Sequence, residues 1–244
     1  MNSDELNPMV TQSNFQFSAI DVDDLTSSEY TLVNIAIDLS SSVYGYYDDL
    51  VQSIETIIDA CKKSDRAENL MVRVTYFNSS VNEFHGFKTL YSLSKDDYKQ
   101  MPNPAGMTAL YDGTIDAIES VEQYGKTLTE QEFEANGILF VVTDGVENNS
   151  NANVQKVIDR FKQLKYNESL ESLQSFLIGV NTNDNYVKDF LDDFNKDVGF
   201  DEFIEVENAT TESLSKLAKF VSKSISLQSQ AVGTGGPSKI IPRF

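Results

Sequence analysis

The feature that most constrains the fold is an alternation of short apolar runs with segments of helical periodicity. The runs that resemble buried strands occupy 31–38, 70–77, 137–144, 173–180 and 202–206. Between them, apolar residues recur at spacings of three and four, which places them on one face of a helix, most clearly over 47–61. Near-continuous apolar strands that alternate with amphipathic helices predict an α/β fold, with a mostly parallel central sheet and helices on both faces.

One pair of strands breaks the parallel pattern. The run 81–87 follows 70–77 after only the polar turn 78–80, and so short a connection joins antiparallel strands. We therefore expect one antiparallel edge strand. The second helix is expected to start near Ala109 and to end at Gly125 as its C-cap, and the last helix is expected to cover 211–226.

The two ends of the chain differ in composition from the middle. Residues 1–30 carry six acids and no Lys or Arg, whereas residues 227–244 contain no acid and are rich in Gly, Ser and Gln. We expect an acidic N-terminal arm over 1–29, of which part could be an edge strand, and a flexible C-terminal tail over 227–244. The folded domain is expected to span 30–226.

Charge and cysteine content narrow the classes of partner. The formal net charge of −19 repels phosphate backbones and anionic lipids, which argues against nucleic-acid and membrane partners and favours cations. Cys61 is the only cysteine, so no internal disulfide can form, and the N-terminus has neither the basic start nor the apolar centre of a secretory signal. These features predict a cytoplasmic protein; a role as a virion component stays open.

Oxygen-bearing side chains gather where predicted strands end. Asp38, Ser40 and Ser42 follow the first strand, Asp144 ends a later one, and Thr108 lies in the loop before the second helix. In a doubly wound sheet, ligands bind outside the carboxyl ends of the strands. Two carboxylates and three hydroxyls suit Mg²⁺ or Mn²⁺ better than zinc. Taken singly, Ser42 and Thr108 could be helix N-caps and Asp144 a turn residue.

Together these motifs resemble the von Willebrand factor A domain family. Asp-x-Ser-x-Ser after the first strand, Gly-x-Thr-Ala-Leu before a helix and Thr-Asp-Gly after a later strand match that family's metal-ion-dependent adhesion site (MIDAS). The resemblance implies a Rossmann-like fold over residues 30–226. It also implies that Ser40, Ser42 and Thr108 coordinate the ion, directly or through water, and that Asp38 and Asp144 supply charge largely through bridging waters. Ser41 departs from the family, which usually has glycine there.

The resemblance implies binding rather than catalysis: an Asp or Glu carboxylate of a partner protein completes the coordination of the ion. Long-range repulsion by the acidic surface should slow this association at low salt. Some family members couple ion binding to movement of the last helix, which corresponds to 211–226 here. The alternatives are a structural subunit of a larger assembly, with the metal as a folding clamp, and a metal-dependent phosphohydrolase. No phosphate-binding loop or nucleophile elbow occurs in the sequence, and the only histidine, His85, falls on a strand away from the site.

Overall fold

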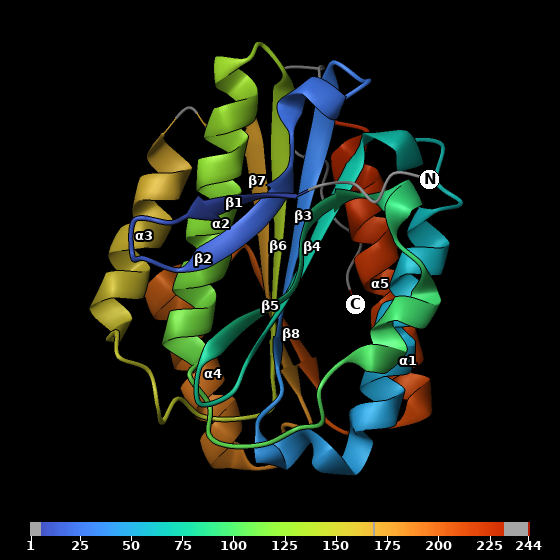
Figure 1. Cartoon of the computed structure of the whole chain (residues 1–244). Coiled ribbons are helices and arrows are strands. Elements are labelled where there is room, and N and C mark those ends of the chain that lie inside the picture. Colours follow the sequence, from blue (N-terminus) through green and yellow to red (C-terminus); the bar gives the residue numbers. More distant parts are fainter. Residues whose placement is uncertain (1–5, 168, 232–243) are drawn as a thin grey trace.

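The strands of this chain form one mixed sheet (Figure 1). The structure, a computed structural model, describes residues 6–167, 169–231 and 244. The spatial order of the strands is β1-β2-β5-β4-β3-β6-β7-β8. Their bounds are β1 Leu6–Val10, β2 Gln16–Ile20, β3 Glu29–Asp38, β4 Leu70–Phe77, β5 Val81–Thr89, β6 Glu134–Thr143, β7 Ser172–Val180 and β8 Glu202–Val206.

The centre of the sheet is parallel, as predicted. Strand β3 pairs in parallel with both β4 and β6, and β6, β7 and β8 continue in the same direction. Strand β5 runs antiparallel to β4. The predicted α/β class, with a Rossmann-like sheet that carries antiparallel pairing toward one side, is confirmed. The carboxyl ends of the parallel strands all meet at one edge, which lies at the bottom of Figure 1.

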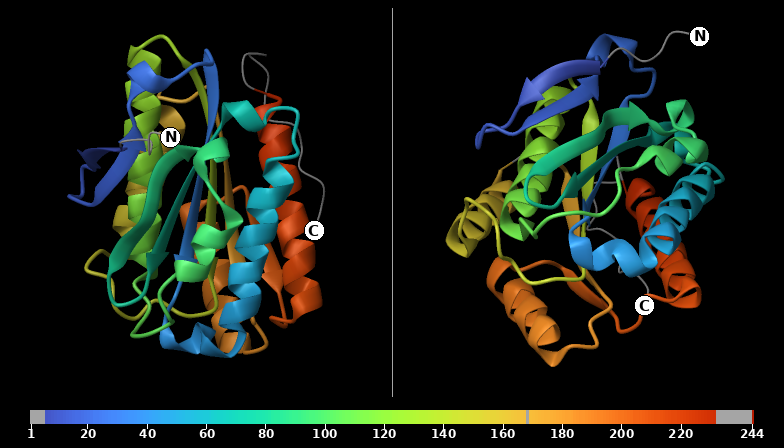
Figure 2. Two further views of the ribbon diagram at one scale, coloured as in Figure 1. Left: turned by 45° about the vertical axis from the view of Figure 1, so that its right-hand side comes forward. Right: turned by 60° about the horizontal axis from the view of Figure 1, so that its bottom comes forward.

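Helices cover both faces of the sheet. Helices α1 (Tyr47–Cys61) and α5 (Thr211–Ser229) pack side by side on one face, over the apolar residues of β3, β4 and β6. Helices α2 (Leu110–Glu130), α3 (Val154–Tyr166) and α4 (Asn185–Val198) cover the other face (Figure 2). Every second residue of β3 from Val33 to Ile37 enters the α1/α5 core, while Leu32, Asn34 and Ala36 face the opposite side. Successive side chains of a strand point to opposite faces of the sheet, and both faces of β3 are buried.

The sheet continues past β5, where the sequence predicted its edge. Residues 6–20, expected to be an arm or an edge strand, form the hairpin β1–β2, and β2 meets β5 in parallel at Ala19 and Phe87. A Cβ at Gly86 would lie 2.1 Å from the Ser18 carbonyl oxygen, so only glycine allows β2 to approach β5 this closely. The hairpin is therefore fitted to the sheet, and the sheet crosses the boundary expected at residues 29 and 30.

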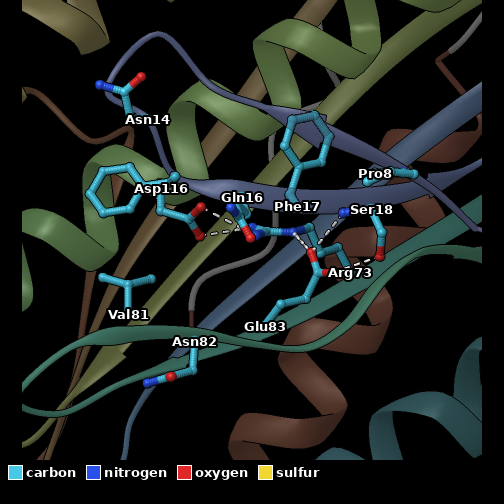
Figure 3. A pocket seen from close by; sticks show the side chains of 11 residues that line it. Pro8, Asn14, Gln16, Phe17, Ser18, Arg73, Val81, Asn82, Glu83 and Asp116 are labelled. Carbon is cyan, nitrogen blue, oxygen red and sulfur yellow. Dashed lines mark hydrogen bonds and ion pairs between the residues drawn. The ribbon is translucent and has the colours of Figure 1, made fainter.

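Buried ion pairs hold the hairpin in place (Figure 3). The Arg73 guanidinium, 1% exposed, binds Glu83 at 2.8 Å and Asp116 at 2.9 Å, and it lies over the Phe17 ring of β2. The Glu83 carboxylate in turn accepts hydrogen bonds from the backbone N–H and hydroxyl of Ser18. In the turn of the hairpin, Ser13 donates to Glu119, the partner of Arg160. These side-chain bonds anchor the hairpin in place of a long ladder.

Helix α2 passes through Gly125, so the prediction that Gly125 ends this helix is wrong. A Cβ at this position would lie 2.7 Å from Leu170 and 2.8 Å from the carbonyl oxygen of Ser169. The glycine thus serves close packing within the helix. The last helix ends at Ser229, three residues beyond its expected end. Most of the predicted tail, 232–243, lies outside the described residues. Within the described ranges, no helix combines the length and apolar character needed to span a membrane.

Candidate functional site

Three loops converge at the carboxyl edge of the sheet, which Figure 2 (right) brings forward. The first follows β3, the second precedes α2 and the third follows β6. The first two are joined by backbone hydrogen bonds from Ala105 to the carbonyl of Leu39 (2.9 Å) and from Ser41 to the carbonyl of Gly106 (3.2 Å). The Asn148 N–H donates to the carbonyl of Thr108 (3.1 Å) and ties the third loop to the second. All five residues of the predicted metal site lie on these loops or at the strand ends that lead into them.

The first loop is a 3₁₀ helix over Ser41–Tyr46, which leads directly into α1. Residues three apart eclipse in such a helix, and accordingly Val43 and Tyr46 are buried while Ser41 and Tyr44 are exposed. Ser42 caps no helix with its side chain: its hydroxyl lies 2.9 Å from Ser40 Oγ and donates to Asp144 Oδ1 at 2.7 Å. The cap interpretation of Ser42 is therefore wrong. The loop directs its hydroxyls toward the end of β6.

The departure from glycine at Ser41 causes no backbone strain. Ser41 has the right-handed backbone of the 3₁₀ helix and is not among the residues with positive φ. Its hydroxyl donates to the carbonyl oxygen of Gly106 at 3.0 Å, the atom to which its N–H also donates. The serine therefore adds a contact between the first and second loops.

Asp38 is the most deeply buried acid of the site, at 1% exposure. Its Oδ1 accepts from the Ser40 N–H at 2.8 Å and its Oδ2 accepts from the Thr143 hydroxyl at 2.6 Å. Burial raises the pKa of Asp38 to about 6; the hydrogen bond from Thr143 opposes this rise and the charge of Asp144 adds to it. Burial also raises the pKa of Asp144, against hydrogen bonds from Ser42 and Tyr46. Among the residues that the structure describes, neutral donors alone stabilise these two carboxylates.

Thr108 completes the set from the second loop. Its N–H donates to Asn148 Oδ1 at 2.8 Å, and Ala109, rather than Thr108, is the N-cap of α2. Gly106 has φ +82°, and a Cβ there would lie 2.5 Å from Ser79 Oγ, so the backbone requires glycine. A Cβ at Gly145 would lie 3.4 Å from Thr108 Oγ1 and 3.9 Å from Asp38 Oδ2. The oxygens of Thr108 and Asp38 therefore face one small space beside Gly145.

This donor set fits a hard divalent cation. It offers two carboxylates, Asp38 and Asp144, and three hydroxyls, and such oxygen ligands favour Mg²⁺ or Mn²⁺. Within the described part of the chain, no three His, Cys, Asp or Glu side chains gather to hold a metal, so the hydroxyls are essential to any site here. Two buried carboxylates without a basic neighbour gain most from a cation, because it removes the cost of burying their charge.

Several supporting residues were not identified from the sequence. Thr143 and Tyr46 bind the two carboxylates, and Asn148 holds Thr108. Glu147 organises the third loop by accepting from the N–H groups of Tyr111, Asn149 and Ser150. Only Thr143 carried a signal, since it adjoins Asp144 in the motif. The others are common loop residues whose role depends on contacts between distant segments.

Other polar groups lie away from this edge. His85 on β5 has its Nδ1 2.9 Å from the Gly86 carbonyl oxygen and its Nε2 2.9 Å from the Tyr98 hydroxyl. Burial lowers the pKa of His85 to about 4. A pocket of about 540 Å³ opens between β2 and β5, but Arg73, Glu83 and Asp116 in its wall already pair with one another (Figure 3). Neither place adds a group to the carboxyl-edge site.

Neither a protein-family model nor a curated protein sequence matches the chain. Solved structures resemble its fold. The PilB minor pilin from Streptococcus sanguinis superposes with a TM-score of 0.62 at 15% identity, over 89% of this chain and 66% of the pilin chain. The pilus adhesin SpaC from Lactobacillus rhamnosus GG gives a TM-score of 0.61 at 10% identity, over 82% of this chain and 30% of that one.

A third structure has a metal at the corresponding kind of motif. Proximal thread matrix protein 1 from the mussel byssus, described with a zinc-occupied MIDAS motif, gives a TM-score of 0.56 at 18% identity. The match covers 84% of this chain and 47% of that protein. The match thus covers at most about two-thirds of the length of each of these three neighbours. At such low identities the likeness concerns the fold: the chain has the α/β fold of a group of structures that includes pilus proteins and a protein with a MIDAS motif.

Proposed function

We propose that this chain is a metal-ion-dependent protein-binding module of the von Willebrand factor A type. In this proposal Ser40, Ser42 and Thr108 hold Mg²⁺ or Mn²⁺, and Asp38 and Asp144 supply the negative charge. The observation that carries the proposal is the convergence of these side chains from three loops, with two buried carboxylates that no basic group among the described residues neutralises. The metal supplies a local positive charge in an otherwise acidic protein.

The partner group we propose is an Asp or Glu carboxylate of another protein. Two carboxylates of the site bring a divalent ion close to neutrality, and the hydroxyls add no charge, so the ion still attracts an anionic oxygen. Ser42 is exposed, whereas Asp38, Ser40 and Thr108 are buried, so the site opens to solvent on the Ser42 side. Two structural neighbours, a minor pilin and a pilus adhesin, are in keeping with a protein-binding role.

Binding is favoured over catalysis because the site offers no acid–base pair beyond its two carboxylates. His85, the only histidine, is engaged on β5. We propose the cytoplasm as the setting, because Cys61 is buried and free. Movement of the last helix remains a proposal as well: α5 packs on α1, which continues from the first loop of the site.

The proposal is tested by affinity capture with the whole chain as bait, in parallel with excess magnesium and with a chelator. Asp144→Ala serves as the control bait, after its metal affinity and its unfolding transition have been measured. A protein retained only with magnesium, and lost with Asp144→Ala, supports the adhesion mechanism. A partner that ignores both the chelator and the substitution overturns it.

A further inference from the structure

Two exposed apolar side chains lie on the loops that carry the candidate metal ligands, one on each of two loops. Tyr44, 77% exposed, lies in the first loop, and Met107, 47% exposed, directly precedes Thr108 in the second. Large apolar side chains exposed this far bury little surface within the fold, and contact with a partner would bury more. We infer that Tyr44 and Met107 form the contact surface that selects which carboxylate binds; this inference rests on the proposed function.

The geometry of the first loop directs Tyr44 toward the second loop. Residues three apart in a 3₁₀ helix share one face, and Tyr44 follows Ser41 by three within Ser41–Tyr46. Ser41 donates from both its N–H and its hydroxyl to the carbonyl oxygen of Gly106. Tyr44 therefore shares the side of the helix that Ser41 presents to the Gly106 carbonyl, and we place Tyr44 and Met107 at this junction between the two loops.

The backbone of Met107 is anchored to the turn between β4 and β5. Its N–H donates to Ser79 Oγ at 3.0 Å, and Ser79 lies in the turn between β4 and β5. The carbonyl of the same serine accepts from Asn149 Nδ2 of the third loop at 2.8 Å. The backbone of Met107 is thus tied to the β4–β5 turn, which the third loop holds in turn, while its flexible thioether side chain is about half exposed to solvent. Such a side chain adapts to apolar partners of different shapes.

Tyr44 and Met107 determine which residues are favoured next to the partner's Asp or Glu. A carboxylate that reaches the metal brings its neighbouring residues against Tyr44 and Met107, where an aliphatic or aromatic side chain buries apolar surface. Further acids beside that carboxylate are disfavoured, because Asp48 is exposed at the start of α1 and the chain carries a net charge of −19. The partner segment is therefore a single Asp or Glu flanked by an apolar residue and without acidic neighbours.

A peptide array provides the test. Each peptide carries a central Asp with Leu, Phe, Ser, Lys or Glu as its neighbour, and the whole chain is applied with Mg²⁺ or with a chelator. The variants are Tyr44→Ser, Met107→Ser and the double substitution. Tyr166→Ser is the matched control, since Tyr166 is 87% exposed at the far end of α3. Magnesium affinity is measured separately by calorimetry for every variant.

We expect magnesium-dependent binding that is strongest with Leu or Phe beside the Asp. Each single substitution should weaken that binding about fivefold and the double substitution should abolish the preference, with magnesium affinity and the Tyr166→Ser control unchanged. Magnesium-dependent binding without an apolar preference, or with a preference that survives the double substitution, overturns this inference and leaves the proposed function standing. Binding to no peptide in magnesium, or equal binding with the chelator, overturns both.

Discussion

Two clusters of buried carboxylates in this fold are balanced in different ways. On the hairpin side of the sheet, Asp116 and Glu83 share the guanidinium of Arg73. Burial raises the pKa of Asp116, and the nearby positive charge opposes that rise. At the carboxyl edge, hydroxyls and a backbone amide of the described residues oppose the effect of burial on the pKa of Asp38. In the first cluster, an arginine of the chain balances the negative charge of the carboxylates. In the second cluster, a cation from solution would have to do so.

The largest loss of stability is expected when the ion-pair cluster around Arg73 is broken. Arg73→Met leaves Asp116, 1% exposed, as an unpaired buried acid and also releases the bond that holds Glu83 under the hairpin. Removal of one partner from a buried pair costs about 3–5 kcal/mol, and urea unfolding measures the loss. Lys196→Met is the control, because its partners Asp192 and Asp193 are exposed and no measurable change is expected. A loss no larger than the control's would contradict the role given to Arg73.

The second prediction concerns the open cluster and its dependence on metal. Magnesium at a hundred times its dissociation constant should raise the free energy of unfolding of the wild type by about 2.7 kcal/mol, because it binds only the folded state. Asp38→Asn and Asp144→Asn should fold without metal and lose this gain. Thermal unfolding with magnesium and with a chelator measures it. Variants that retain the full gain would remove these carboxylates from the metal site.

The third prediction uses pH. The pKa of Asp38 rises from 3.8 to about 6 on folding, so the folded state binds the proton more tightly. Its contribution to stability is full below about pH 4 and is lost as pH rises through about 6, on the order of 2–3 kcal/mol. Unfolding of the wild type in chelator, compared with Asp38→Asn across pH 4–7, isolates this contribution. Parallel curves for the two proteins would show that Asp38 titrates normally.

The smallest effect is expected where the first and second loops meet. Ser41→Gly removes the hydroxyl bond to the Gly106 carbonyl and adds backbone freedom, which should cost about 1 kcal/mol of stability. Gly45→Ala is the matched control in the same 3₁₀ helix, since a Cβ there meets nothing within 4 Å. Denaturant unfolding and magnesium titration measure both variants. A Ser41→Gly protein as stable as the wild type would mean that the serine contact is dispensable.

The sequence predicted most of the central sheet, and it grouped five candidate metal residues that the structure brings to one edge, because both inferences depend on local patterns. Asp38, Ser40 and Ser42 lie within one short segment, and strand and helix periodicity needs only neighbouring residues. The hairpin β1–β2 was recognised only as an arm or an edge strand. Its position depends on Arg73 and Arg160, which are separated from it by more than fifty residues.

Gly125 illustrates the same limit. A glycine near the expected end of a helix favours a C-cap, and only the contact of α2 with Ser169 and Leu170 shows that the helix continues. Tyr46, Asn148 and Glu147 are likewise ordinary residues until the fold brings three loops together. The strands and most of the helices were therefore predictable from local patterns, whereas the contacts between distant segments were not; the metal chemistry of the site stays a prediction.

The most direct test of the account is a crystal structure of the whole chain loaded with Mn²⁺, with the ion located by its anomalous scattering. We expect one strong peak at the carboxyl edge of the sheet, within about 2.0–2.4 Å of Ser40 Oγ, Ser42 Oγ and Thr108 Oγ1 or of waters bound to Asp38 and Asp144. A peak elsewhere, or none at this edge with manganese in excess, would show that these residues do not form a metal site.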